Sequence, residues 1–200
     1  MIAYKVVEDF EKAMADFVGS SYAVAVDSCT NAIFLCCYYN KVKEVILPKK
    51  TYVSVPCSII HAGGSVTFED YDWKGSYQLK PYPIYDSACQ IYRNMYIKES
   101  YQCISFSANK IINIGKGGMI FTDNIDAVKW FKKARYEGRN EVPIMEDDFD
   151  MLGWNMYMTP EQASRGLLLF SNIKPGYIEC TYPDLSKFKI FTEKRVKYDK

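Results

Sequence analysis

Residues 101–122 read YQCISFSANKIINIGKGGMIFT, and this stretch decides the fold. Its apolar runs at 103–107 and 118–122 predict two strands, separated by a glycine-rich turn that follows Lys110. Open α/β sheets bind their ligands at the ends of strands, which is where this lysine stands. Two serines precede the lysine and offer hydroxyl groups to an anion. We therefore expect a ligand site centred on Lys110.

The rest of the chain alternates short apolar runs with helical patterns. Further strands are predicted at 22–26, 45–48, 65–68 and 83–88, and helices at 7–18, 32–39, 51–61, 124–137 and from 159 onward. Such alternation predicts an α/β fold with a mainly parallel sheet and helices on both faces. We expect one domain over residues 1–180, followed by an amphipathic segment over 181–200.

Composition narrows the class of function. The 200 residues are 48% hydrophobic and 24% charged, which is typical of a folded chain with a sizeable core. The 25 basic and 24 acidic residues give a net charge of +1, so neither nucleic acid nor a membrane is an expected partner. Seven irregularly spaced cysteines favour reduced thiols, and the charged N-terminus does not resemble a secretory signal. We expect a cytoplasmic protein that binds a small polar ligand.

Several common sites are excluded by the residues themselves. A phosphate-binding P-loop needs glycine where Lys110 stands and serine or threonine where Gly117 stands. No dinucleotide-binding glycine motif follows the first strand, and His61 is the only histidine, so no metal site is expected. A partly buried lysine amine can instead attack an aldehyde, while hydroxyl groups and helix N–H groups hold a phosphate. This combination suggests a lysine that forms a Schiff base with pyridoxal phosphate.

Six segments stand in the order of motifs found in one enzyme family. They are the opening helix at 10–19, DSCTNA at 27–32, P48 with TYV at 51–53, PIYDSACQ at 83–90, the SFSANK to GKGG segment at 105–118, and GWNMYMT at 153–159. In this order they resemble the DegT/DnrJ/StrS sugar aminotransferases, whose fold is the aspartate-aminotransferase (type I) pyridoxal-phosphate fold. The likeness covers about residues 10–170 and implies that residues 1–180 are the large, pyridoxal-phosphate-binding domain.

The resemblance also implies roles for residues that hold the cofactor. Lys110 would be the catalytic residue that bonds to pyridoxal phosphate. The hydroxyl of Ser105 and the turn of Ser28, Cys29 and Thr30 would bind its phosphate, because a helix start favours an anion.

Four other positions complete the implied site. Tyr52 would lie against the cofactor ring, Gln90 would hydrogen-bond its phenolic oxygen, and Ser87 would face its pyridine nitrogen. Asn155 matches a family residue that reaches the phosphate of the neighbouring subunit, which implies a homodimer with shared active sites.

The chain departs from the family pattern where the chemistry is most sensitive. The family has an aspartate at the position of Ser87, and a neutral hydroxyl does not keep the pyridine nitrogen protonated. Asp86 is adjacent, but alternation along a strand is expected to turn it away. Asp27 replaces an asparagine and Lys116 replaces a glutamate. Residues 70–83 are too short for the extra strand and helix of the family, and the small C-terminal domain is expected to be absent.

The resemblance implies an aminotransferase that moves an amino group from an amino-acid donor such as glutamate to a nucleotide-linked keto sugar. Two alternatives follow from the departures. One is a degenerate homologue that binds the cofactor, or dimerises with a partner, without transaminase activity. The other is a different pyridoxal-phosphate reaction, such as elimination, that tolerates an unprotonated ring nitrogen.

Overall fold

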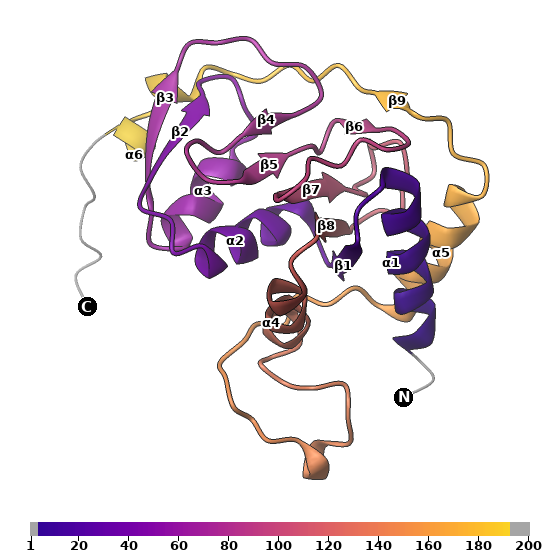
Figure 1. Ribbon diagram of the computed structural model, residues 1–200. Coiled ribbons are helices and arrows are strands. Elements are labelled where there is room, and N and C mark those ends of the chain that lie inside the picture. The colour runs from indigo at the N-terminus through magenta and orange to yellow at the C-terminus, as the bar shows by residue number, and fades with distance from the viewer. Residues whose placement is uncertain (1–3, 193–200) are drawn as a thin grey trace.

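The computed structural model describes residues 4–192, and its centre is a five-stranded sheet with the order β1-β8-β7-β5-β4 (Figure 1). The strands are, in that order, β1 (Tyr22–Val26), β8 (Gly118–Thr122), β7 (Tyr101–Ser105), β5 (Ile84–Asp86) and β4 (Tyr77–Gln78). A parallel pair, β2 (Glu44–Pro48) and β3 (Ser65–Glu69), continues this arrangement, because Ile46 bridges to Lys80 just after β4.

Strand directions follow from the pairings. β5 pairs with β7 in parallel, whereas β8 is antiparallel to both β1 and β7, and β4 is antiparallel to β5. The bridge between Ile46 and Lys80 is antiparallel, so β2 and β3 run in the direction of β5. Among the strands of the central sheet and the β2–β3 pair, β1, β2, β3, β5 and β7 therefore point one way, whereas β4 and β8 are reversed. The predicted α/β fold with its mainly parallel strands is confirmed.

The reversed strand β4 lies in the short connection between β3 and β5. Residues 70–83 connect β3 to β5, and a parallel strand between them would need crossover connections of roughly a dozen residues on both sides. A hairpin needs far fewer residues. The chain accordingly folds back, with Tyr77 opposite Asp86 and Gln78 opposite Tyr85. The sheet stays continuous because Lys80, just beyond β4, also reaches Ile46.

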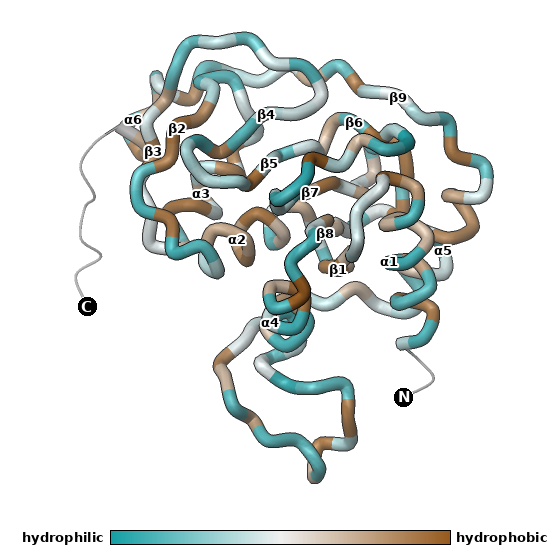
Figure 2. Tube along the Cα trace, in the orientation of Figure 1, coloured by the Kyte–Doolittle hydropathy of each residue, from teal (hydrophilic) through white to brown (hydrophobic). Residues whose placement is uncertain are grey.

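Helices cover both faces of the sheet, as predicted. α1 (Lys5–Val18) and α5 (Pro160–Phe170) cover one face, while α2 (Cys29–Tyr39), α3 (Ser54–His61) and α4 (Ile125–Arg135) cover the other. Strand β1 shows why: Ala23 and Ala25 face α1, whereas Val24 and Val26 face α2 and α4, because successive side chains alternate. Figure 2 shows the hydrophobic strands in the interior between these helices.

Local signals at two helix ends are confirmed. Gly19 ends α1 in the left-handed conformation with φ of 81°, which costs glycine little. Thr159 and Gln162 form the predicted capping box at the start of α5. These ends fix where the chain leaves each helix, and so fix how α1 and α5 lie side by side on the sheet.

A buried ion pair ties α1 to α4. Arg135 and Glu11 are 2% and 5% exposed, and the guanidinium contacts the Glu11 carboxylate directly. Both groups also bond to the backbone of Ala25 in β1, with Glu11 accepting from its N–H at 2.8 Å and Arg135 donating to its carbonyl at 2.6 Å. Glu141 accepts a further bond of 3.1 Å from Arg135. The loop that follows α4 is thus fixed at its root, and it projects from the molecule in Figure 1.

The last described residues run back over the sheet instead of forming one amphipathic helix. A short ribbon pairs β6 (Gln90–Ile91) with β9 (Gly176–Tyr177), and it is followed by the 3-10 turn Leu185–Lys187 and by α6 (Lys189–Thr192). The remainder of the amphipathic segment expected over 181–200 lies outside the described residues. Within residues 4–192 none of the helices is long and apolar enough to cross a membrane.

One expectation about the cysteines is corrected. Cys89 and Cys180 form a disulfide, whereas the other five, all within residues 4–192, are free thiols. The sequence pattern missed this bond because nothing local links two residues that are 91 positions apart. The β6 to β9 ribbon brings them together.

Candidate active site

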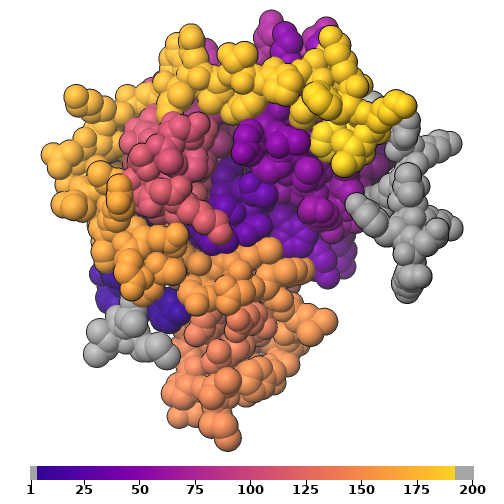
Figure 3. Space-filling model, turned by 180° about the vertical axis from the view of Figure 1, so that it is seen from behind, coloured from indigo at the N-terminus to yellow at the C-terminus, as the bar shows by residue number. Residues whose placement is uncertain are grey.

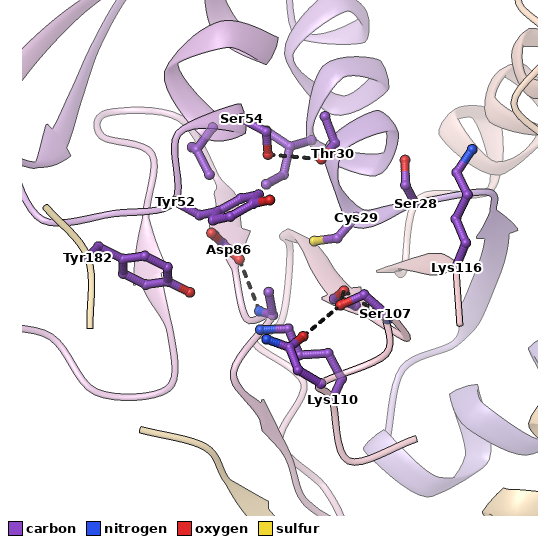
Figure 4. A pocket seen from close by; sticks show the side chains of 16 residues that line it. Ser28, Cys29, Thr30, Tyr52, Ser54, Asp86, Ser107, Lys110, Lys116 and Tyr182 are labelled. Atoms are coloured by element: carbon purple, nitrogen blue, oxygen red, sulfur yellow. Dashed lines mark hydrogen bonds between the residues drawn. The ribbon is translucent and has the colours of Figure 1, made fainter. Parts of the chain in front are cut away.

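A cavity of about 230 Å³ lies between the ends of β5 and β7 and the start of α2. It is several times the roughly 30 Å³ that one water molecule occupies in the liquid. Its lining includes Lys110, Asp86, Thr30, Ser105 and Tyr52, which come from five separate segments of the chain. Figure 4 shows the α2 residues and Lys110 turned toward the same space. The predicted site around Lys110 is therefore a real hollow, and four of these five residues were expected there.

The start of α2 forms one wall of the cavity. Ser28 caps the helix, and its hydroxyl accepts a bond of 3.2 Å from the N–H of Asn31. Cys29 takes the first helical position without a positive φ, so its side chain is tolerated there. Burial raises the pKa of the Cys29 thiol well above its usual value, which keeps it uncharged. The helix start thus remains a favourable place for an anion.

Glycine is required opposite this turn. A Cβ atom on Gly118 would lie 2.4 Å from the backbone nitrogen of Cys29 and 2.6 Å from the carbonyl oxygen of Ser28. No real side chain approaches backbone atoms so closely. Gly118 therefore lets β8 pack directly under the helix start, and this explains part of the glycine-rich sequence after Lys110.

Two departures from the family pattern compensate each other. Asp27 and Lys116 form an ion pair of 2.8 Å, although they are 89 residues apart. Asp27 also accepts bonds from Ser28 and Asn31, at 3.1 and 2.7 Å. The Lys116 side chain lines the cavity and is 65% exposed, so its charge offsets the carboxylate beside the helix start.

Lys110 lies in the turn after β7, half-buried in the cavity wall. Its backbone N–H donates to the carbonyl of Ser107 at 2.9 Å, which closes the turn and directs the side chain inward. Its amine lies 3.6 Å from the sulfur of Cys89. The hydroxyl of Ser105 also lines the cavity and donates to Ser107 at 3.2 Å. An amine and two hydroxyl groups thus lie together at one strand end.

Asp86 lies in the cavity, contrary to the expectation that it would turn away. The carboxylate is 5% exposed and accepts bonds from the Tyr77 hydroxyl at 2.9 Å and from the N–H of Ala88 at 3.0 Å. Burial raises the pKa of this carboxyl group, and the two hydrogen bonds and the charge of Lys110 oppose that rise.

Ser87 is the residue that turns away. It is fully buried, and its hydroxyl bonds to Ser76 at 2.7 Å and to Gln102 at 2.9 Å instead of reaching the cavity. Side chains alternate along the strand as anticipated, and the side chain that faces the cavity is that of position 86, not that of position 87. The charged residue at this strand end is therefore present, at position 86.

Two other expected residues do not line the cavity. Gln90 lies in β6 with its side chain against Gly75, where a Cβ atom would clash with it. Asn155 is exposed and donates to the carboxylate of Glu137 at 2.8 Å. Gln90 is held away from the cavity because β6 pairs with β9. Asn155 lies on the exposed surface of the chain.

Aromatic rings close the outer side of the cavity. Tyr52 is 55% exposed at the mouth, and the ring of Tyr182 lies 6.0 Å from it. Burial and the nearby Asp86 carboxylate raise the pKa of Tyr182 to about 12. Sequence reasoning missed Tyr182, and also Ser54, whose hydroxyl accepts from Thr30 at 2.9 Å. Neither residue has a local motif that could reveal it.

The fold is that of pyridoxal-phosphate-dependent aminotransferases. The structure of AtS13 from Actinomadura melliaura superposes with a TM-score of 0.72 at 18% identity, covering 83% of this chain and 59% of that one. PseC of Helicobacter pylori, an aminotransferase involved in the biosynthesis of pseudoaminic acid, gives a TM-score of 0.71 at 16% identity, covering 84% and 58%. These likenesses establish the architecture around the cavity.

The sequence itself matches the DegT/DnrJ/EryC1/StrS aminotransferase family over residues 1–86 and 96–174. The chain belongs to this family. It is 26% identical to GDP-perosamine synthase of Caulobacter vibrioides over 206 aligned positions, which cover 80% of this chain and 55% of that protein. The chain thus spans little more than half the length of this relative.

Proposed function

We propose that this chain is the cofactor-binding part of a pyridoxal-phosphate-dependent sugar aminotransferase. The observation that carries the proposal is the placement of the Lys110 amine and the Asp86 carboxylate in one cavity with the start of α2. The amine can react with an aldehyde, the carboxylate can pair with a basic ring nitrogen, and the helix start can bind a phosphate. Family membership and the fold support the same conclusion.

The residues present fit this cofactor. Ser28, Thr30 and Ser105 offer hydroxyl groups beside the free N–H groups of a helix start, which suits a phosphate. The buried Asp86 carboxylate accepts hydrogen bonds from two neutral groups, the Tyr77 hydroxyl and the N–H of Ala88. A protonated ring nitrogen would give this carboxylate a charged partner. Tyr52 offers a flat aromatic surface at the mouth.

When bound, pyridoxal phosphate supplies a carbon that an amine can attack and a ring that spreads the electron pair left behind when a proton leaves the substrate. Lys110 is the group that would take that proton and return it, because its amine lies inside the cavity. Asp86 would hold a proton on the ring nitrogen, and its burial strengthens that interaction. The helix start and Lys116 would hold the phosphate and so orient the whole group.

The proposed donor is an amino acid such as glutamate, and the proposed acceptor is a nucleotide-linked keto sugar. The proposal is supported by two similar proteins, one named GDP-perosamine synthase and the other, PseC, described as an aminotransferase involved in the biosynthesis of pseudoaminic acid. We further propose that the enzyme works in the cytoplasm, where nucleotide sugars are made.

A homodimer completes the proposal. Asn155 is exposed and does not line the cavity of its own chain, and we propose that it exchanges its bond to Glu137 for a contact with a second copy. The projecting loop nearby exposes large apolar side chains, with Met145 at 92% and Leu152 at 93%. Exposed apolar groups of this size on one loop are typical of an interface between proteins.

Reconstitution tests the proposal directly. Purified protein mixed with pyridoxal phosphate is expected to turn yellow, and reduction with borohydride followed by mass spectrometry should locate the cofactor on Lys110. Lys110→Ala should lose both signals, whereas Lys98→Ala, outside the cavity, should keep them. Attachment at other lysines but not at Lys110 would refute the proposal.

A second candidate remains, a cofactor-binding homologue without transaminase activity. It is favoured by the absence of Gln90 from the lining of the cavity. Yellow protein that transfers no amino group from glutamate to pyridoxal phosphate would support it. The elimination alternative has less support than the other two, because the Asp86 carboxylate lines the cavity and Ser87 does not.

A further inference from the structure

Residues 176–187 form a strap across the outer side of the cavity. At its start Ile178 donates its N–H to the carbonyl of Cys89 at 2.7 Å, beside the ribbon of β6 and β9. At its end Leu185 donates to the carbonyl of Lys49 at 2.8 Å. In Figure 3 this segment, in yellow, runs along the molecule above the surfaces that flank the hollow. Both ends of the strap are therefore attached to segments that border the site.

The strap brings Tyr182 to the cavity. Its ring stacks on Trp73 at 6.1 Å with an interplanar angle of 14°, and it meets Tyr52 edge-on at 6.0 Å. Its hydroxyl lies 3.5 Å from the sulfur of Cys89. Figure 4 shows the ring on the side of the cavity opposite α2. Tyr182 is thus a wall of the site that only this strap supplies.

A covalent bond holds the strap in place. Cys180 lies two residues before Tyr182 and forms the disulfide with Cys89. Cys89 is 2% exposed and its sulfur lies 3.6 Å from the amine of Lys110. The bond that fixes the strap is therefore made at the cofactor site itself. Ion pairing of Lys49 with Asp184, at 3.7 Å, adds a weaker contact at the other end.

We propose that the strap closes the cofactor site, that Tyr182 is the wall it supplies, and that the Cys89–Cys180 disulfide is a redox-sensitive latch for it. The proposal rests on the proposed function for the identity of the ligand, but the latch itself is a property of the protein without cofactor. Closure excludes water from the site, and it slows the escape of whatever is bound inside.

Reduction by a dithiol opens the latch. One thiolate of the reductant attacks the half-buried sulfur of Cys180, the bond to Cys89 breaks, and Cys89 takes the electron pair and a proton. The second thiol of the reductant then displaces Cys180 as a free thiol and leaves as a cyclic disulfide. Two electrons pass from the dithiol to the two cysteines. The Cys89 thiol then remains beside Lys110, and the strap keeps its non-covalent contacts, which include its hydrogen bonds, the Lys49–Asp184 ion pair and the ring contacts of Tyr182.

Hydrogen exchange of the cofactor-free protein tests the latch. Thiol counts in denaturant should give five in the oxidised and seven in the reduced protein, which defines the two samples. The N–H groups of residues 176–187 are expected to exchange faster after reduction and in Cys180→Ser, while those of β7 and β8 are unchanged. Cys57→Ser, at a free half-buried cysteine, is the matched control and should behave as the unaltered chain. Equal exchange of the strap in both redox states would overturn the latch.

Release of pyridoxal phosphate tests the role of Tyr182. Loss of a stacked aromatic wall is expected to speed release about two- to tenfold in Tyr182→Ala, with Tyr182→Phe close to the unaltered chain because the ring is kept. Reduction should speed release in the unaltered chain but add little in Tyr182→Ala. Tyr177→Ala, on the same strap but outside the cavity, is the control.

The outcomes separate the two proposals. Release at the same rate in Tyr182→Ala and in the unaltered chain would overturn the role of Tyr182 while leaving the proposed function intact. A chain that takes up no pyridoxal phosphate would overturn the proposed function and with it the role of Tyr182. The exchange measurement would still decide whether the disulfide latches the strap.

Discussion

The hydroxyl of Tyr77 donates a 2.9 Å hydrogen bond to Oδ2 of Asp86, directly across the β4–β5 pair. Tyr77 is in turn bonded to the buried hydroxyl of Thr51. The orientation of the carboxylate in the candidate active site is therefore set by β4, the strand that fills the shortened middle of the chain. Tyr77 is a positioning residue, since it acts on the site through Asp86.

Tyr77→Phe is expected to weaken cofactor binding. A hydrogen bond to a charged group contributes about 1.5–3 kcal/mol, which corresponds to roughly a 10- to 100-fold loss of affinity if the full term is realised. The same change removes a bond that favours the charged carboxylate, so the pKa of Asp86 should rise further. As the pH is lowered and Asp86 takes up a proton, pyridoxal phosphate binding should weaken. In a titration against pH, this weakening should begin at a higher pH in the variant than in the unaltered chain. Tyr85→Phe, on the opposite face of β5, should leave both the affinity and its pH dependence unchanged.

Asp86→Asn is expected to stabilise the cofactor-free protein at neutral pH. Burial raises the folded-state pKa of Asp86 above its unfolded value, so the protonated carboxyl is the form that folding favours. The resulting stability is present below the unfolded pKa of about 3.9 and is lost as pH rises through the raised folded-state value. Urea unfolding of both proteins between pH 4 and 8 should therefore show a difference that grows with pH in favour of the variant. A constant difference across this range would contradict the prediction, and the variant should still bind pyridoxal phosphate less tightly.

Gly118→Ala should displace the start of α2. The new methyl group would clash with backbone atoms of Ser28 and Cys29, and overpacking of this kind costs about 1–3 kcal/mol. Pyridoxal phosphate affinity and urea stability should both fall. Gly176→Ala meets nothing within 4 Å and should change stability by less than about 0.5 kcal/mol. Similar results for the two variants would show that Gly118 is not a contact point for the helix start.

Glu11→Gln should destabilise the fold without touching the cavity. It leaves the 2% exposed guanidinium of Arg135 short of its main partner, and breaking a buried ion pair costs roughly 3–5 kcal/mol. Urea unfolding measures the loss. The exposed pair of Lys129 and Asp126, at 3.4 Å, offers the comparison, because Lys129→Met should cost less than about 1 kcal/mol.

Leu152→Asp is expected to dissociate the proposed homodimer. A charge in place of a 93% exposed leucine on the projecting loop would be buried without a partner in the interface. Sedimentation velocity at several concentrations should show a monomer for this variant and a dimer for the unaltered chain. Ile190→Asp places the same charge on α6, at a residue 77% exposed, and should leave the dimer intact. A monomeric unaltered chain would refute the dimer itself.

Much of the fold was predictable because its signals are local. The apolar runs of β1 and β8 were predicted with the bounds that the structure has, since each is enclosed by polar or glycine residues. β4 was not predicted, because residues 71–82 show no period and Tyr77 becomes strand only by pairing with Asp86. A strand that forms only by pairing with a neighbouring strand leaves no recognisable pattern in its own sequence.

The residues of the candidate site also divide into those that have a local signal in the sequence and those that have none. Lys110, Thr30, Ser105 and Tyr52 follow recognisable strand and helix ends, and the structure brings them together. Asp86 was expected to turn away but lies in the cavity, because one residue of register is enough to reverse the direction of a strand side chain. Tyr182 and the Cys89–Cys180 disulfide depend on a contact between distant parts of the chain, so no local reading could have found them.

The reversed strand β4 has a wider consequence for how a sheet can be built. Two parallel strands, here β2 and β5, are joined into one sheet through a single short segment of opposite direction, without a second crossover helix. Strand β4 also supplies Tyr77, whose hydroxyl donates a hydrogen bond to the Asp86 carboxylate in the cavity.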